Sequence, residues 1–185
     1  NWNSLTIKPV GSVIVSKSTT AGQNFPMIVF EGADKITIDG LNSGLNSLKI
    51  CPFNSNRSTI IFKRDATNNV ITNCTVLGST NDPNEGTIYF AGNASQTGND
   101  NNNISNCNIG PVGSSLPVKA IYSEGTTSTT EKFNSGNIVT GCNIYDYLKT
   151  NSLNSGSSAG IYLSDGSTDW TITNNKFYQT TARTN

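Results

Sequence analysis

Short β-prone segments alternate with polar stretches along the whole chain. One kind of segment begins with isoleucine each time and is followed by a turn of Gly, Asp or other polar residues. These segments are Ile28–Phe30, Ile60–Phe62, Ile88–Phe90, Ile121–Ser123 and Ile161–Leu163. No segment sustains the i, i+3, i+4, i+7 apolar spacing of an amphipathic helix, so we predict strands and no helix.

A second phrase marks a corner of the backbone. Its copies are offset by 33, 33, 35 and 33 residues, and they begin at Ile38, Ile71, Ile104, Val139 and Ile172. The third position is always Gly or Asn, the two residues that best tolerate a left-handed backbone. These corner residues are Gly40, Asn73, Asn106, Gly141 and Asn174. A left-handed corner rebuilt at a fixed period is typical of a solenoid.

A third short segment follows each later corner, at Thr75–Val76, Asn108–Ile109, Asn143–Ile144 and Lys176–Phe177. Three short strands per repeat, stacked in parallel about 4.8 Å apart, predict an all-β, right-handed, single-stranded parallel β-helix. We expect about five to six coils of roughly 33 residues, in one domain over 1–185. The alternative is a β-sandwich or meander, which has no reason to repeat Gly or Asn at one position.

Insertions and chain ends complete this picture. We expect insertions in the loops Gly44–Ser47, Thr80–Glu85, Gln96–Asn103, Thr126–Gly136 and Thr150–Ser158. Asn1–Ile7 reads as a strand already under way, and Tyr178–Asn185 stops just after a repeat. Uncovered strand edges invite association, and terminal repeats normally carry a distinct cap. The sequence therefore predicts a segment of a longer solenoid, capped by adjoining repeats or by neighbouring chains.

The repeat phrases resemble a known family. Ile36–Leu41, Val70–Cys74 and Trp170–Asn175 resemble pectate-lyase-type parallel β-helix repeats, and the resemblance covers roughly Leu5–Tyr178. The Asn- and Thr-rich composition is similar to that of large bacterial surface proteins exported through the type IX route. The resemblance implies either a lyase or hydrolase acting on polysaccharides, or an adhesin or repeat spacer, because fold alone does not select a function.

The composition narrows the partners and the location. The chain has 12 basic and 12 acidic residues, so it lacks the positive charge that nucleic-acid binding requires. No run of 18 apolar residues is present, so no membrane span is predicted. The polar surface is largely Asn, Ser, Thr and Gly, and charged residues make up only 13% of the chain. This favours a secreted or cell-surface protein, and the resemblance implies a bacterial one.

The four cysteines are Cys51, Cys74, Cys107 and Cys142. They form no CxxC pair and the chain has no His, so zinc and haem sites are not expected. The last three directly follow a corner, where the first coil has Leu41 and the last has Asn175. We expect an inward column of small buried thiols. Disulfides between adjacent coils fall within the Cα separation that a bridge allows, although three stacked cysteines cannot all pair.

The corner asparagines and a column of tyrosines are the other repeated features. Asn73 and Asn106 could bond amide to amide along the stack, as in other stacked β structures. If Ile88 and its equivalents point inward, strand alternation turns a tyrosine outward in three successive coils. This predicts an exposed face formed by Tyr89, Tyr122 and Tyr162. Such rings either stabilise the coils by stacking on one another or contact sugar rings or a protein partner.

Carboxylates decide whether catalysis is expected. Glycoside hydrolysis usually requires two carboxyl groups about 5–10 Å apart. The weak candidates are Glu31, Asp34, Arg64 and Asp65. Glu31 occupies the same position as Lys63 in the next coil, which predicts an exposed ion pair worth little energy.

Metal ions and cofactors have weak support in the sequence. Calcium in the Asn99–Asn103 loop, or near Asp165 and Asp169, is suggested by ligand type alone. No cofactor is otherwise expected.

These patterns favour a non-enzymatic function. We expect a structural or adhesive segment of a larger secreted surface protein or extracellular filament, with an extracellular glycan or a protein as the partner of the tyrosine face. The competing function is a lyase or glycoside hydrolase of pectate-lyase-like fold, which requires a convergent acid/base site.

Overall fold

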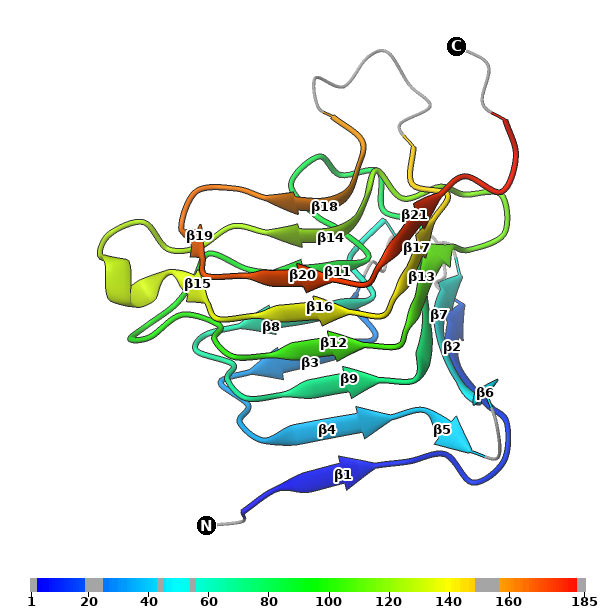
Figure 1. Cartoon of the computed structure of the whole chain (residues 1–185), viewed down its shortest axis with the longest axis horizontal. Coiled ribbons are helices and arrows are strands. Elements are labelled where there is room, and N and C mark those ends of the chain that lie inside the picture. The colour runs from blue at the N-terminus through cyan, green and yellow to red at the C-terminus, as the bar shows by residue number, and fades with distance from the viewer. Residues whose placement is uncertain (1–2, 19–24, 43–44, 54–55, 149–156, 183–185) are drawn as a thin grey trace.

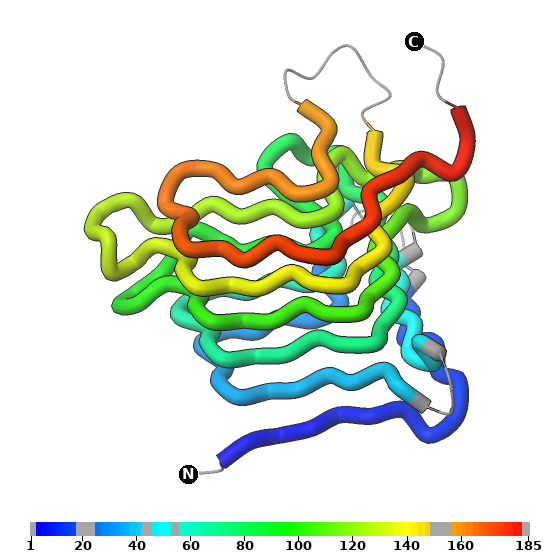
Figure 2. Tube along the Cα trace, in the orientation of Figure 1, coloured from blue at the N-terminus to red at the C-terminus, as the bar shows by residue number. Residues whose placement is uncertain are grey.

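A computed structural model describes residues 3–18, 25–42, 45–53, 56–148 and 157–182. Within them the chain passes in turn through three parallel sheets, which confirms the predicted all-β parallel solenoid (Figures 1 and 2). Sheet A contains β1 (Leu5–Ile7), β4 (Ile36–Asp39), β9 (Val70–Thr72), β12 (Asn103–Ser105), β16 (Ile138–Thr140) and β20 (Thr171–Thr173). Sheet B contains β2 (Val13–Ser18), β7 (Leu48–Phe53), β10 (Cys74–Gly78), β13 (Asn108–Pro111), β17 (Asn143–Tyr145) and β21 (Lys176–Tyr178).

Sheet C lies behind sheet A in Figure 1 and has five strands. It contains β3 (Ile28–Glu31), β8 (Ile60–Lys63), β11 (Ile88–Phe90), β14 (Lys119–Ser123) and β18 (Ala159–Leu163). Two short pairs lie outside the three sheets: the antiparallel pair of β5 (Leu41–Asn42) with β6 (Leu45–Asn46), and the parallel pair of β15 (Asn134–Ser135) with β19 (Ser167–Thr168). The helical structure in the described residues is a single 3₁₀ turn, Thr130–Lys132.

The core is a set of side-chain columns that run along the stack. Phe30, Phe62 and Phe90 stack with ring centroids 4.7 and 4.5 Å apart. Trp170 closes this column edge-on, 4.9 Å from the Phe90 ring. Isoleucines at the inward positions of the middle coils are fully buried, as at Ile71. One short apolar segment per sheet therefore suffices for a continuous core, because each coil packs on its neighbours.

The corner between sheets A and B is left-handed in four of the five predicted places. The backbone φ angles are +55° at Asn73, +52° at Asn106, +66° at Gly141 and +57° at Asn174. Gly40 was predicted to match them and does not, since its φ is not positive. A Cβ added to Gly40 would lie 2.3 Å from the carbonyl oxygen of Asn73. Gly40 is therefore required by the close approach of the next coil and not by a left-handed turn.

The first coil differs because it carries an insertion directly after its corner. The β5–β6 hairpin occupies this place, so the predicted loop Gly44–Ser47 contains a strand. Leu41, which we expected to point inward, is 49% exposed. The inward position belongs to Leu48, which pairs with Cys74. Of the predicted insertion Thr150–Ser158, residues 150–156 lie outside the described part of the chain.

The cysteines form the predicted buried thiols. All four are free and buried. The Sγ atoms of Cys74, Cys107 and Cys142 approach backbone carbonyl oxygens of sheet A at 3.9, 3.6 and 3.7 Å. Hydrogen bonding to the thiols above and below it, together with burial, raises the pKa of Cys107. This column is packing and not a row of disulfides.

The amide ladder forms at a different corner from the one predicted. The Asn73 Nδ2 donates to the Asp39 carboxylate at 2.8 Å. The ladder lies instead between sheets C and A, where Asn69, Asn102 and Asn137 are buried. Asn69 Nδ2 donates to Asn102 Oδ1 at 3.0 Å, and Asn102 Nδ2 donates to Asn137 Oδ1 at 3.1 Å. These amides satisfy backbone groups that the tight turn would otherwise leave unpaired.

Candidate functional site

The three predicted tyrosines lie in register on the outer side of sheet C. Tyr89 pairs with Tyr122, and Tyr122 pairs with Tyr162. The rings of Tyr89 and Tyr122 stack at 5.4 Å and 12°, whereas those of Tyr122 and Tyr162 are tilted by 46° at 5.7 Å. The same outer column contains Val29 and Ile61 in the first two coils. The register thus builds one outward column of five side chains, aromatic in its last three members.

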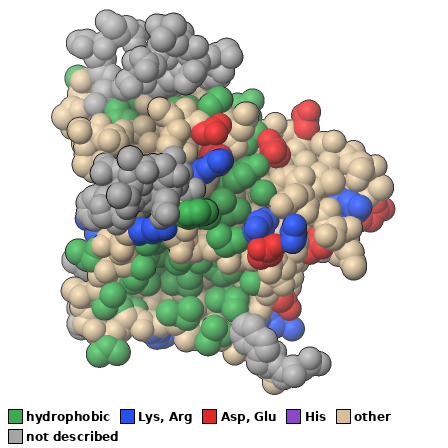
Figure 3. All heavy atoms as spheres, turned by 180° about the vertical axis from the view of Figure 1, so that it is seen from behind, with side chains coloured by type: hydrophobic (Ala, Val, Ile, Leu, Met, Phe, Trp, Pro, Cys, Tyr) green, Lys and Arg blue, Asp and Glu red, His purple; other side chains and the backbone are tan. Residues whose placement is uncertain are grey.

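This column is not the open face that the sequence predicts. Tyr122 is only 4% exposed and Tyr89 is half-buried, while Tyr162 is 39% exposed. The column is open at the opposite end, where Val29 is 41% exposed. From behind, hydrophobic side chains gather over the half of the molecule that belongs to the N-terminal coils (Figure 3). The tyrosine half is partly covered, so the prediction of three exposed rings is wrong for Tyr122.

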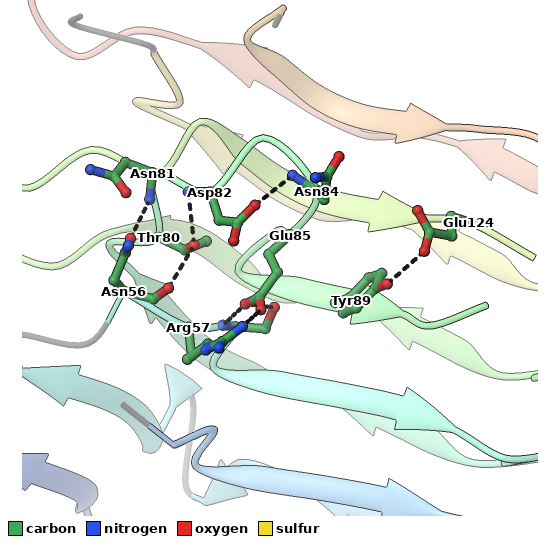
Figure 4. A network of polar contacts seen from close by, with 10 residues as sticks. Asn56, Arg57, Thr80, Asn81, Asp82, Asn84, Glu85, Tyr89 and Glu124 are labelled. Atoms are coloured by element: carbon green, nitrogen blue, oxygen red, sulfur yellow. Dashed lines mark hydrogen bonds and ion pairs between the residues drawn. The ribbon is translucent and has the colours of Figure 1, made fainter. Parts of the chain in front are cut away.

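The predicted insertion Thr80–Glu85 provides part of this cover, and hydrogen bonds hold it against the preceding coil. The Glu85 carboxylate accepts from the Arg57 guanidinium at 2.6 Å and from the Ser58 backbone N–H at 2.7 Å. The Thr80 hydroxyl donates to the Asn56 carbonyl oxygen at 3.2 Å. Figure 4 shows Glu85 turned toward Arg57 beneath this loop. Glu85 is 7% exposed, and its charge-assisted hydrogen bonds to Arg57 and Ser58 hold the loop in place.

A second cation fastens the loop to the tyrosine column. Lys119, at the start of β14, is 3% exposed and donates from Nζ to the Pro83 carbonyl oxygen. Its Nζ lies 5.0 Å from the ring centroid of Tyr122 and 5.0 Å from that of Tyr162. Both distances fall in the range of cation–π attraction, which is stronger where water is excluded. Lys119 therefore orients both rings.

A cleft of about 280 Å³ opens between this loop and the end of the column. The rings of Tyr122 and Tyr162 and the Lys119 side chain form one part of its wall. The other lining residues are polar or from the loop, and they are Pro83, Asn84, Ser157 and Ser164. The cleft combines aromatic faces with hydroxyl, amide and ammonium groups, a combination that suits a small polyhydroxylated ligand. We call it the tyrosine cleft.

One carboxylate organises the hydroxyl ends of the buried rings. Glu124 accepts from Tyr122 Oη at 2.8 Å. It also accepts from Tyr89 Oη at 3.1 Å, as Figure 4 shows. Burial and the Glu124 carboxylate raise the pKa of Tyr122 to about 12, and for the same two reasons the pKa of Tyr89 is raised. Both hydroxyls therefore stay protonated and donate to Glu124 at neutral pH. Glu124 therefore has a structural role, because its carboxylate holds both tyrosine hydroxyls.

The weak catalytic candidates Glu31, Asp34 and Arg64 also form ion pairs or hydrogen bonds between adjacent coils. Glu31 forms ion pairs with Lys63 at 2.9 Å and Arg64 at 2.7 Å, as predicted for Lys63. The hydrogen bond from Lys63 is the main reason that the pKa of Glu31 is lowered. Asp34 accepts from Thr67 Oγ1 and Asn68 Nδ2, both at 3.0 Å. These groups hold adjacent coils together.

Asp65 is bound by backbone amides. Its carboxylate accepts the N–H groups of four successive residues of the next coil, Ser95, Gln96, Thr97 and Gly98, at 3.0–3.3 Å. Both oxygens of the Asp65 carboxylate are therefore engaged by backbone N–H groups. Glu31, Asp34 and Asp65 are thus each engaged by groups of the next coil.

The predicted calcium sites are partly occupied by the protein itself. In the Asn99–Asn103 loop, the Oδ1 atoms of Asn99 and Asn102 accept hydrogen bonds inside the buried ladders. Asp165 and Asp169 are exposed, on either side of β19 in the last coil. Across the described residues, no group of three or more His, Cys, Asp or Glu side chains is placed to hold a metal ion. Calcium binding stays a prediction without a defined ligand set.

Sequence reasoning missed Lys119 and the loop over the tyrosines. Lys119 contacts Pro83, 36 residues away, and neither residue belongs to a repeated phrase. It also missed the buried asparagine ladder, although the sequence contains the signal. Asn69, Asn102 and Asn137 follow one another at 33 and 35 residues, the same offsets as the corners.

Two further findings concern membrane-spanning helices and similarity to known proteins. Among the residues that the structure describes, no helix is long and apolar enough to cross a membrane. Comparisons of the chain with protein-family models, with curated proteins and with solved structures found no match.

Proposed function

We propose that the chain is a non-enzymatic, adhesive β-solenoid segment of a secreted or cell-surface protein, and that it binds a saccharide in the tyrosine cleft. The observation that carries the proposal is the Tyr162 ring, 39% exposed beside the buried Lys119 and Tyr122. An exposed ring at the mouth of a polar cleft offers a flat face to a sugar ring. The neighbouring hydroxyl and amide groups offer hydrogen bonds to sugar hydroxyls.

The rigidity of the cleft supports binding. The Arg57–Glu85 ion pair anchors the loop that carries Pro83 and Asn84, and Lys119 bonds to the same loop. Groups that are already fixed lose little conformational freedom on binding, so weak polar contacts retain more of their energy. A cleft of about 280 Å³ is at the lower limit of small-molecule sites, which favours recognition of one sugar unit of a chain.

The competing function is a polysaccharide lyase or glycoside hydrolase. Such an enzyme needs a free acid and base on either side of the bond that it cleaves. Glu31, Asp34 and Asp65 bind cations, side chains or backbone amides of adjacent coils. Glu124, the carboxylate nearest to the tyrosine rings, accepts from two of their hydroxyls. The described site supports adhesion better than bond cleavage.

A glycan array tests the proposal. We expect the wild-type chain to bind a subset of immobilised neutral or acidic oligosaccharides, and Tyr162→Ser to weaken that binding at least tenfold. The matched control is Tyr178→Ser, because Tyr178 is 42% exposed and stacks on Tyr145 at 5.5 Å, on sheet B and outside the cleft. The control should bind like the wild type.

Two outcomes would contradict the proposal. One is that no oligosaccharide binds, and the other is that both tyrosine variants lose binding equally. Incubating the bound oligosaccharides with the wild-type chain and analysing them by mass spectrometry tests the competing function. Shortened products that require Glu31 or Asp65 would favour the enzyme.

A further inference from the structure

A contact between the sheet and a loop walls off one side of the tyrosine cleft. Lys119 reaches from β14 to the loop Thr80–Glu85, where its Nζ donates to the Pro83 carbonyl oxygen. Lys119 is only 3% exposed and lines the cleft together with Pro83. The contact therefore joins sheet C to the loop and forms a wall of the cleft.

The loop that forms this wall is bonded to the coils on both sides. Toward the preceding coil, the Glu85 carboxylate accepts from the Arg57 guanidinium at 2.6 Å and from the Ser58 hydroxyl at 2.9 Å. Toward the following coil, the Thr80 carbonyl oxygen accepts from the Val118 N–H at 3.0 Å. Bonds along both edges hold the loop down on the sheet. The wall is therefore a fixed part of the cleft.

The tyrosine column continues past this wall, but it is not a path for a glycan chain. Tyr122 follows Tyr162 in the register and is 4% exposed, and Tyr89 in the next coil is half-buried. The rings of Tyr89 and Tyr122 stack on each other at 5.4 Å, and both hydroxyls donate to Glu124. A sugar that stacks on the Tyr162 ring therefore meets covered rings on the side of Tyr122.

We infer, on the basis of the proposed saccharide binding, that the cleft takes the terminal sugar at the non-reducing end of a glycan. A unit in the middle of a chain needs two exits, one for each neighbouring sugar, whereas a terminal unit needs only one. The contact between Lys119 and Pro83 closes one exit. Glycans attached to a surface are linked through the reducing end, so their free terminus is the non-reducing one. A volume of about 280 Å³ suits a single unit.

The chemistry of the wall fits a chain terminus. A terminal unit has one more free hydroxyl than an internal unit, at the position where the next linkage would form. The ammonium of Lys119 and the amide of Asn84 line this part of the cleft, and both are groups that hydrogen-bond hydroxyls. A further sugar attached at that hydroxyl would collide with the wall. The cleft thus selects a terminus both by shape and by polar contacts.

Competition with soluble sugars tests the inference on the wild-type chain. The immobilised ligand is the oligosaccharide that binds best on the glycan array. The three soluble probes are that oligosaccharide, the same oligosaccharide extended at its non-reducing end by a sugar that does not bind by itself, and the methyl glycoside of its terminal unit. We expect the extended probe to compete at least about tenfold more weakly than the original. The methyl glycoside should compete within about tenfold of the original, because the terminal unit alone fills the cleft.

Lys119→Ala tests the wall itself. Loss of this side chain opens the closed side of the cleft, so the affinities for the extended and the original oligosaccharide should become similar. Both affinities should fall, because the cation that orients the two rings is lost. Lys49→Ala is the matched control, since it removes a lysine side chain from β7 on sheet B, outside the cleft. The control should keep the wild-type preference for the original oligosaccharide.

Three results would overturn the inference. They are an extended probe that competes as well as the original on the wild type, a methyl glycoside that does not compete at about a hundredfold excess, and a Lys119→Ala variant that binds with the same preference as Lys49→Ala. If Lys119→Ala loses all binding, the two wild-type comparisons decide. A wild type that binds no oligosaccharide contradicts the proposed function itself, so the two kinds of failure are distinct.

Discussion

At the scale of single residues, asparagine has two distinct roles in this chain. At the corner between sheets A and B, Asn106 adopts a φ of +52°, which its short polar side chain tolerates better than a branched one. At the corner between sheets C and A, the buried Asn102 binds the coils on either side through its amide. The first role requires only a permissive backbone, whereas the second requires this side chain.

The buried ladder makes Asn102→Ala strongly destabilising. Asn102 Oδ1 accepts from the backbone N–H and from the Nδ2 of Asn69, both at 3.0 Å, and its Nδ2 donates to the Ala66 carbonyl oxygen at 2.9 Å. Loss of the amide leaves these buried groups unpaired. We expect the free energy of unfolding to fall by about 3 kcal/mol, measured by urea denaturation.

The control is Asn108→Ala on sheet B. Asn108 Oδ1 accepts one hydrogen bond from Asn143 at 2.8 Å and is half-buried on the outer side of the sheet. Water can replace that bond, so the loss should stay below about 1 kcal/mol. Equal losses in the two variants would show that the ladder has no special role.

The raised pKa of Asp100 makes the free energy of unfolding depend on pH. Burial, with a smaller contribution from the charge of Asp65, raises the pKa of Asp100 to about 6, although the Ser135 N–H donates to it at 2.7 Å. The folded chain therefore holds this proton more tightly than the unfolded chain, where an aspartate titrates near pH 3.9. The stabilising effect of the proton is complete below about pH 4 and is lost as the pH rises through about 6.

Asp100→Asn removes this titration while keeping an oxygen to accept from Ser135. We expect the variant to be more stable than the wild type by about 1–2 kcal/mol at pH 7, an amount reduced for partial exposure, with the difference vanishing near pH 4. Urea denaturation at several pH values measures it. A difference that is constant with pH would show that Asp100 does not titrate in this way.

At the scale of elements, the strands could be predicted because each coil repeats the same short apolar segment and the same corner. An insertion in the first coil interrupts this repeated pattern of strands and corners. The β5–β6 hairpin after Gly40 moved the inward position from Leu41 to Leu48, and no periodic signal marks this shift. Tyr122 is contacted by Tyr89, Tyr162 and Lys119, and it lines one cleft with the Pro83 loop of a different coil. Alternation along one strand gives the direction of a side chain but not what lies over it.

The four buried cysteines give a prediction at this scale. Cys51, Cys74, Cys107 and Cys142 are each at most 1% exposed. We expect none of the four thiols to react with iodoacetamide in the native protein, because labelling requires the coils to separate. Mass spectrometry with increasing urea should show the adducts appearing together with unfolding. Rapid labelling of Cys107 in the absence of urea would contradict the buried column.

At the scale of the whole molecule, the regular and irregular parts of the chain have different roles. The repeat builds a column of coils in which each packs on its neighbours, and the most regular positions are scaffold. The irregular loop that contains Pro83 turns part of the tyrosine column into a cleft. The sequence could place the three tyrosines in one column because register follows from the repeat. It could not show the cleft, which depends on the non-repeating contact between Lys119 and Pro83.

Hydrogen–deuterium exchange tests the proposed recognition of a saccharide at the tyrosine cleft. The wild-type chain would be compared with and without the oligosaccharide that binds best on the glycan array. We expect slower exchange in the segments that line the cleft, 83–85, 119–123 and 159–164, and unchanged exchange in β10 and β13 on sheet B. Protection confined to sheet B or to the ends of the stack, with none around Tyr162, would contradict the account.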